Sequence, residues 1–223
     1  MIPASTSFLD MALLACALAM ALWLRPWRLL GHRIQRDGSH TTTPLLTPLL
    51  ATLVVLPWMW AMPTLHAMPL QLQWSGACLV VLMLGWPLAM PVLLAVAAIA
   101  ALLSPMDWSQ ALSSAVWQGV VPGTLSLLLG WLIRRVTGEH PFVYILGRTF
   151  IGTALCVFAA GVLSQWAGHA LPAVDSELSL VARWLMAWSD ATLTGMLCAV
   201  FVAFKPEWLA TWSDRLYLHS PPP

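Results

Sequence analysis

The chain has 223 residues, of which 60% are hydrophobic and 9% are charged, and its net charge is +1. A soluble domain carries about a quarter charged residues, so this composition excludes a water-soluble globular protein and predicts an integral membrane protein. The near-neutral charge and the lack of a basic patch with interleaved aromatic residues give no indication of nucleic-acid binding.

The first apolar run extends from Phe8 to Leu24 and predicts a transmembrane helix. No basic residue precedes this run, whereas four arginines follow it before His40. That order is the reverse of a secretory signal peptide, so we expect a helix that is retained. Because positively charged loops stay in the cytoplasm, we expect the N-terminus outside.

The next long apolar stretches raise the question of how often the chain crosses the membrane. One of them, Gln73–Leu103, would be roughly 45 Å long as a single helix, well beyond the hydrocarbon thickness of about 30 Å. The interruption Gly85-Trp86-Pro87 is the natural place for a break. The other expected spans are Leu45–Met62, Ala111–Ile133, Phe142–Trp166 and Leu178–Phe204.

Charge favours two passes over one for Gln73–Leu103. With a single pass, Arg134 and Arg135 would lie outside and the acidic loop with Asp175 and Glu177 inside. Two passes reverse both assignments and agree with the positive-inside rule. We therefore expect an all-α polytopic membrane protein, a single domain over residues 1–223 with about seven transmembrane segments, N-out and C-in.

The third expected segment, about Gln73–Leu84, is too short to span comfortably, so we expect a re-entrant loop to precede it. Such a loop is permitted only where its backbone is buried or lines a cavity. Gln73 and Ser75 would lie on this loop. Two further polar residues at membrane depth, Arg148 and Asp190, are costly unless paired. Either they have structural partners or they take part in transport or coupling, and snorkelling is a third explanation for Arg148.

Four stretches follow one another from Gln73 onward: LMLGWPLAM, HPFVYILGRTFIG, SDATLTGM and, as the tail, FKPEWLATWSDRLYL. Together they resemble the CbiM-like family, the substrate-binding membrane subunits of energy-coupling-factor (ECF) ABC transporters for cobalt and nickel. The resemblance implies a seven-helix subunit with an external N-terminus in the bacterial inner (plasma) membrane. Its implied partners are membrane lipid, a coupling membrane subunit and ATPase subunits.

In that family the N-terminal amine, a histidine at the second position and a histidine before the third helix hold the metal, a nitrogen set suited to Ni(II) or Co(II). Here Met1 supplies the amine, Ile2 stands at the second position, and Gln73 stands at the place of the later histidine. Asp190 stands where the family has a glutamate. The resemblance thus implies a solute site of Met1, Gln73 and Ser75, with Met1 as the one retained metal ligand and no cofactor besides a transported ion.

The expected function is substrate capture for an ECF-type importer of a transition metal ion. The alternative is a membrane protein of the same fold that has lost metal binding and has a structural or accessory role. An enzyme is not expected, because no nucleotide-binding glycine loop and no nucleophile–base pair stands out.

Overall fold

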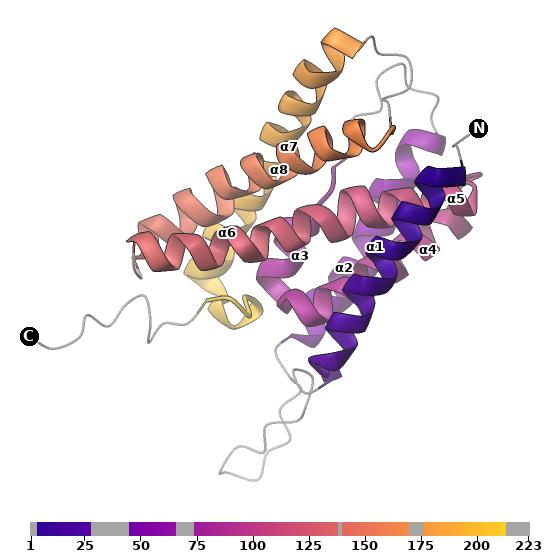
Figure 1. Ribbon diagram of the computed structural model, residues 1–223. Helices are drawn as coiled ribbons and strands as arrows, with labels where there is room; N and C mark the ends of the chain where they lie inside the picture. Colours follow the sequence, from indigo (N-terminus) through magenta and orange to yellow (C-terminus); the bar gives the residue numbers. More distant parts are fainter. Residues whose placement is uncertain (1–3, 28–44, 66–73, 138–139, 170–175, 213–223) are drawn as a thin grey trace, which may run out of the picture.

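A computed structural model describes residues 4–27, 45–65, 74–137, 140–169 and 176–212 of the chain (Figure 1). Within these ranges the regular structure is entirely helical and no strand occurs. The helices are α1 (Ala4–Trp23), α2 (Leu46–Leu65), α3 (Ala77–Leu84), α4 (Trp86–Leu103), α5 (Trp108–Ser114), η2 (Ala115–Val120), α6 (Val121–Thr137), η3 (Val143–Ile151), α7 (Gly152–Trp166), α8 (Ser176–Phe204) and η4 (Pro206–Trp208).

Five of the described helices are long and apolar enough to cross a membrane, and α1 is a shorter apolar helix. Their outer faces carry many exposed large apolar side chains, Trp166 and Phe204 among them. Such faces are unfavourable in water and favourable in lipid. Across the described ranges the expected all-helical class is confirmed, and these helices indicate a membrane-embedded protein. The five spans are Leu46–Leu65, Trp86–Leu103, Trp108–Val136, Val143–Trp166 and Leu178–Phe204.

The break at Gly85 is confirmed. α3 ends at Leu84 and α4 begins at Trp86, with Gly85 between them at φ 77° and ψ 152°. Glycine reaches this backbone conformation without the steric penalty of a side chain. Pro87 then stands in the first turn of α4, where a missing N–H costs nothing. Local sequence thus ends one helix and starts the next within a single residue.

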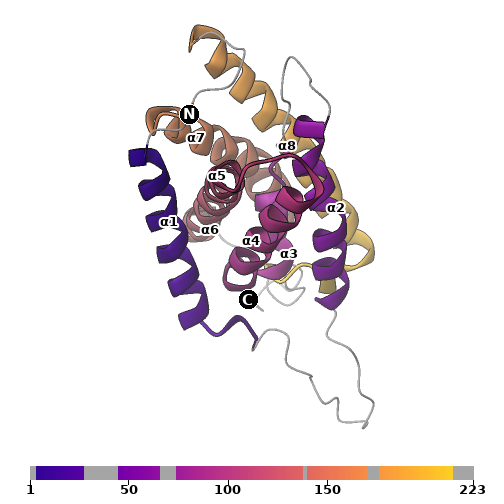
Figure 2. The same ribbon diagram turned by 90° about the vertical axis from the view of Figure 1, so that its right-hand side faces the viewer.

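α3 is the innermost element. All eight of its residues are buried, and the hydrophobic core lies around it and α4. Figure 2 shows α3 and α4 in the middle, with α1 on one side and α2 and α8 on the other. An eight-residue helix is about 12 Å long and cannot cross a hydrocarbon layer of about 30 Å by itself. Its complete burial explains how it is tolerated there.

Contacts between distant segments define two ends of the bundle. At one, which we call the N-terminal end, Trp117 Nε1 donates a 2.8 Å hydrogen bond to Asp10 Oδ1 near the start of α1. At the other, the tail end, residues that follow η4 close the last turn of α3: Ala210 N donates to Met83 O at 3.0 Å, and Thr211 Oγ1 donates to Leu82 O at 2.9 Å. α3 therefore ends at the tail end, and α4 starts from there.

Candidate functional site

Residues Trp74–Gly76, which we call the approach segment, lead into α3 and are fixed by one carboxylate. Asp190 Oδ2 accepts a 3.0 Å hydrogen bond from Ser75 N, and Asp190 Oδ1 accepts a 3.1 Å bond from Gly76 N. Asp190 is 1% exposed. A buried carboxylate is costly unless both oxygens find donors, and two successive backbone amides supply them here. Asp190, mid-way along α8, thus anchors the approach segment.

Two more elements hold Ser75, one through its backbone carbonyl and one through its side-chain hydroxyl. Trp60 Nε1 in α2 donates to Ser75 O at 3.1 Å, and Ser75 Oγ donates to Gln118 O in η2 at 2.6 Å. Pro122, four residues after Gln118, has no N–H to donate to Gln118 O. The hydroxyl also accepts a bond from Ala77 N at 3.2 Å. The hydroxyl of Ser75 therefore donates one hydrogen bond and accepts another within the protein.

Gly76 meets two constraints that other residues would not. Its φ is 64°, in the left-handed region, where an L side chain is strained. A Cβ atom added there would lie 2.8 Å from Leu56 Cδ1, closer than carbon atoms pack. The tight passage between α2 and α8 thus requires glycine, and it aims two amides at the Asp190 carboxylate.

The approach segment is connected to the start of α1 through two neighbouring residues of η2. Trp117 bonds to Asp10 of α1, and the next residue, Gln118, accepts the Ser75 hydroxyl. η2 is a π-helix, a form that widens the helix and often marks functional positions. Both the N-terminal part of α1 and the approach segment therefore contact the same short segment, η2.

A second polar group at the N-terminal end was missed by the sequence reasoning. Ser113 Oγ lies 3.2 Å from His169 Nδ1, and His169 Nε2 lies 3.3 Å from Asp10 Oδ1. That nitrogen is not aligned for a hydrogen bond with the carboxylate, which bonds to Trp117 instead. No nucleophile–base pair stood out in the sequence, whereas the structure brings the Ser113 hydroxyl and the His169 ring within hydrogen-bond distance. The group connects α1, α5 and the residues that follow α7. The expectation that the chain is not an enzyme stays a prediction.

His169 also receives a backbone bond: Arg183 Nη2 donates to His169 O at 2.8 Å, and Arg183 Nη1 donates to Ser164 Oγ at 3.3 Å. Arg183 is 9% exposed. Its guanidinium therefore fixes the last turn of α7 to α8. The sequence carried one signal for the group of Asp10, Ser113 and His169. Asp10 lies in the first apolar run, and a buried carboxylate needs donors from elsewhere in the chain.

The sequence candidates are of two kinds: Met1, Gln73 and Ser75 for the solute site, and Asp190 and Arg148 as polar residues at membrane depth. Ser75 and Asp190 meet at the approach segment. Met1 and Gln73, and Ile2 with them, lie outside the described residues, so their part in the site stays a prediction. Arg148 lies at the tail end, against Gly130 of α6 and over the Tyr144 ring at 5.6 Å, away from the approach segment.

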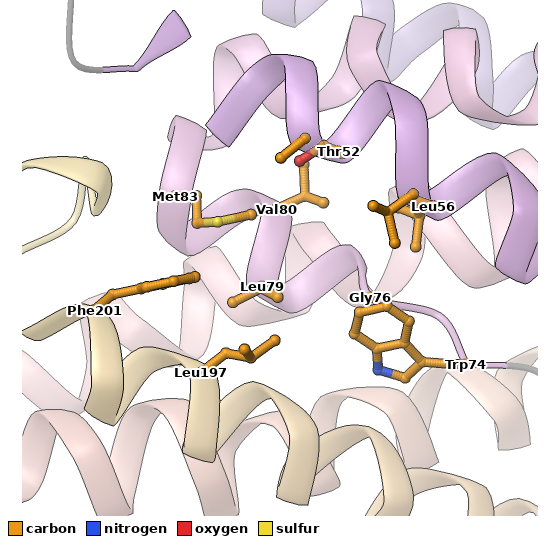
Figure 3. Close-up of a pocket in the computed structure, with 11 residues that line it drawn as sticks. Thr52, Leu56, Trp74, Gly76, Leu79, Val80, Met83, Leu197 and Phe201 are labelled. Carbon is orange, nitrogen blue, oxygen red and sulfur yellow. The ribbon is translucent and has the colours of Figure 1, made fainter. Parts of the chain in front are cut away.

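Beside the approach segment lies a cavity of about 260 Å³ between α2, α3 and α8 (Figure 3). Its walls are almost wholly apolar, with Leu79, Val80 and Leu197 facing the space. A hydrated metal ion would lose its solvation there without gaining ligands. Among the described residues, no group of three or more His, Cys, Asp or Glu side chains could hold a metal ion.

Comparisons of the chain with known protein families, with curated proteins and with solved structures found no significant match.

Proposed function

We propose that this chain is the substrate-capture membrane subunit of an ECF-type ABC importer, of the class that takes up cobalt or nickel. One observation carries the proposal: a short, fully buried helix, α3, whose polar approach is anchored by a carboxylate of the last long helix. The approach segment is linked through η2 to the start of α1. In the CbiM-like family the solute site lies between the N-terminus and the residues before the third helix. A similar capture subunit therefore needs the start of α1 and the approach segment close together.

The proposal includes seven passes with the N-terminus outside. The chain turns at Gly85, and α3 ends where α4 starts, at the tail end. With the N-terminal end outside, Arg134 and Arg135 at the close of α6 lie on the cytoplasmic side, as the positive-inside rule requires. The same orientation puts the tail after α8 in the cytoplasm, within reach of coupling and ATPase subunits.

The kind of solute is inferred from the ligand atoms that Met1, Gln73 and Ser75 would offer at the proposed solute site. An amine with a glutamine carbonyl is a poor ligand set for Ni(II), because an amide oxygen is a weaker and harder donor than imidazole. The hydroxyl of Ser75 already makes two bonds inside the protein. We therefore propose weak binding of a transition metal ion, or capture of another small solute, between Met1 and Gln73. If the chain binds no solute at all, the alternative applies, a structural or accessory role for a membrane protein of the same fold.

Calorimetry on the purified protein with Ni(II) and with Co(II) tests the site. The native chain should show no sub-micromolar binding, and inserting a histidine after Met1 together with Gln73→His should create or strengthen a site. The matched control carries the same insertion with Gln110→His, an exposed position on α5. Tight binding by the native protein refutes the argument from missing ligands. A double variant that binds no better than the control refutes the location of the site.

A further inference from the structure

A cationic groove lies at the tail end of the bundle, between α6 and η3. It encloses about 640 Å³, and three of the six residues that line it are arginines. None of the described residues lining it is acidic. We call it the arginine groove; its lining is Leu127, Gly130, Trp131, Arg134, Arg135 and Arg148.

Arg148 is the least expected member of the groove, because it is 8% exposed on a helix in the apolar part of the chain. Its Nε atom is buried and has no hydrogen-bond partner. In the part of the chain that the structure describes, no carboxylate forms an ion pair with it. A buried guanidinium with an unused donor is costly, and an anion in the groove would remove that cost.

Gly130 makes room for this guanidinium. A Cβ atom at that position would lie 2.6 Å from Arg148 Nε and 2.8 Å from Arg148 Cζ. The planar group therefore lies directly against the α6 backbone. Arg135 lies one turn after Trp131 on α6, and its guanidinium carbon is 5.4 Å from the centre of the Trp131 ring. Packing thus holds two of the three arginines at the groove.

An apolar groove adjoins the arginine groove and shares Trp131 with it. This second groove encloses about 370 Å³ between α6 and α7 and is lined by apolar side chains alone. The indole of Trp131, 60% exposed, lies where the cationic and apolar surfaces meet, the usual position of tryptophan at a membrane interface. The lining of this apolar groove is Leu125, Leu128, Leu129, Trp131, Leu132, Leu155, Cys156 and Ala159.

We propose that these two grooves together form a binding site for an anionic glycerophospholipid. Its phosphodiester would lie among Arg134, Arg135 and Arg148, and an acyl chain would lie along the apolar groove beyond Trp131. Arginine suits this role because its planar fork bonds phosphate oxygens in pairs. Basic pockets at the cytoplasmic ends of transmembrane helices are where such headgroups bind. The apolar groove favours a lipid over free phosphate, which would leave that surface uncovered.

Native mass spectrometry of the purified full chain tests this site with two lipids of identical acyl chains, phosphatidylglycerol and phosphatidylcholine. We expect phosphatidylglycerol to bind in preference, and inorganic phosphate at the same concentration not to compete. Arg134→Gln with Arg135→Gln should weaken that binding by about tenfold or more, since charge-assisted hydrogen bonds to phosphate are lost. Both side chains are exposed, so this variant should fold.

Arg148→Gln and Gly130→Ala provide a second arm, because the first removes the buried cation and the second displaces it. Each should weaken phosphatidylglycerol binding and leave phosphatidylcholine binding unchanged. Arg25→Gln, which removes one exposed arginine elsewhere on the chain, is the control and should change neither. Equal binding of the two lipids, or full competition by inorganic phosphate, overturns the proposal. So does unchanged binding in the Arg134 and Arg135 double variant.

Discussion

Asp190→Ala is the substitution that most directly probes the anchor of the approach segment. The carboxylate accepts the backbone amides of Ser75 and Gly76 at 3.0 and 3.1 Å. Truncation to alanine leaves both N–H groups buried without an acceptor, which costs about 1–3 kcal/mol for each. The free energy of unfolding should therefore fall by roughly 2–6 kcal/mol.

This loss translates into a lower melting temperature. For a chain of this length one kcal/mol corresponds to about 2–4 °C, so Asp190→Ala should melt about 4–24 °C below the native protein. The melting temperature of Asp190→Asn should lie between those of Asp190→Ala and the native protein. Its carbonyl oxygen still accepts one amide, while its NH₂ group faces the other. Thermal unfolding in detergent, followed by intrinsic tryptophan fluorescence, measures both shifts.

Thr192→Ala is the matched control on the same helix. Its side chain is exposed and bonds to Trp188 O in its own helix at 2.8 Å, so its loss should shift stability by no more than about 0.5 kcal/mol. If Asp190→Ala melts at the temperature of this control, the carboxylate does not anchor the approach segment. The account of α3 would then be wrong.

Two further predictions follow from the backbone path. Gly76→Ala should lower the melting temperature and expression, since φ is 64° and the added Cβ would lie 2.8 Å from Leu56 Cδ1; a stable variant would contradict the tight passage. A reporter fused after Gly138 should be cytoplasmic and one fused after Ala173 external, and finding the two reversed would mean that Gln73–Leu103 crosses only once.

Much of the architecture could be predicted because its signals are local. Long apolar runs gave the helices, and Gly85 followed by Pro87 gave the break. Boundaries were less accurate. α5 begins at Trp108 rather than Ala111, because its first turn carries polar side chains that lower local hydropathy. α3 begins at Ala77 rather than Gln73, since the approach segment is held by tertiary bonds in a non-helical path.

The contacts of the candidate site could be anticipated only in part. Asp190 was identifiable as a costly residue, but its partners lie 114 and 115 positions away in sequence, and apolar patterns carry no information on such pairings. The Ser75–Gln118 bond joins residues 43 positions apart, and nothing in the sequence shows that these two residues will meet. Ser113 and His169 meet in the same way, through packing at the N-terminal end.

The central claim, that this chain captures substrate for an ECF-type importer, is tested most directly by purifying it in mild detergent from its native host and identifying what accompanies it. The account predicts that an ATPase and a second, coupling membrane protein co-purify in fixed proportion to the chain. A chain that comes out of the same membranes alone, with no ATPase bound, would contradict it.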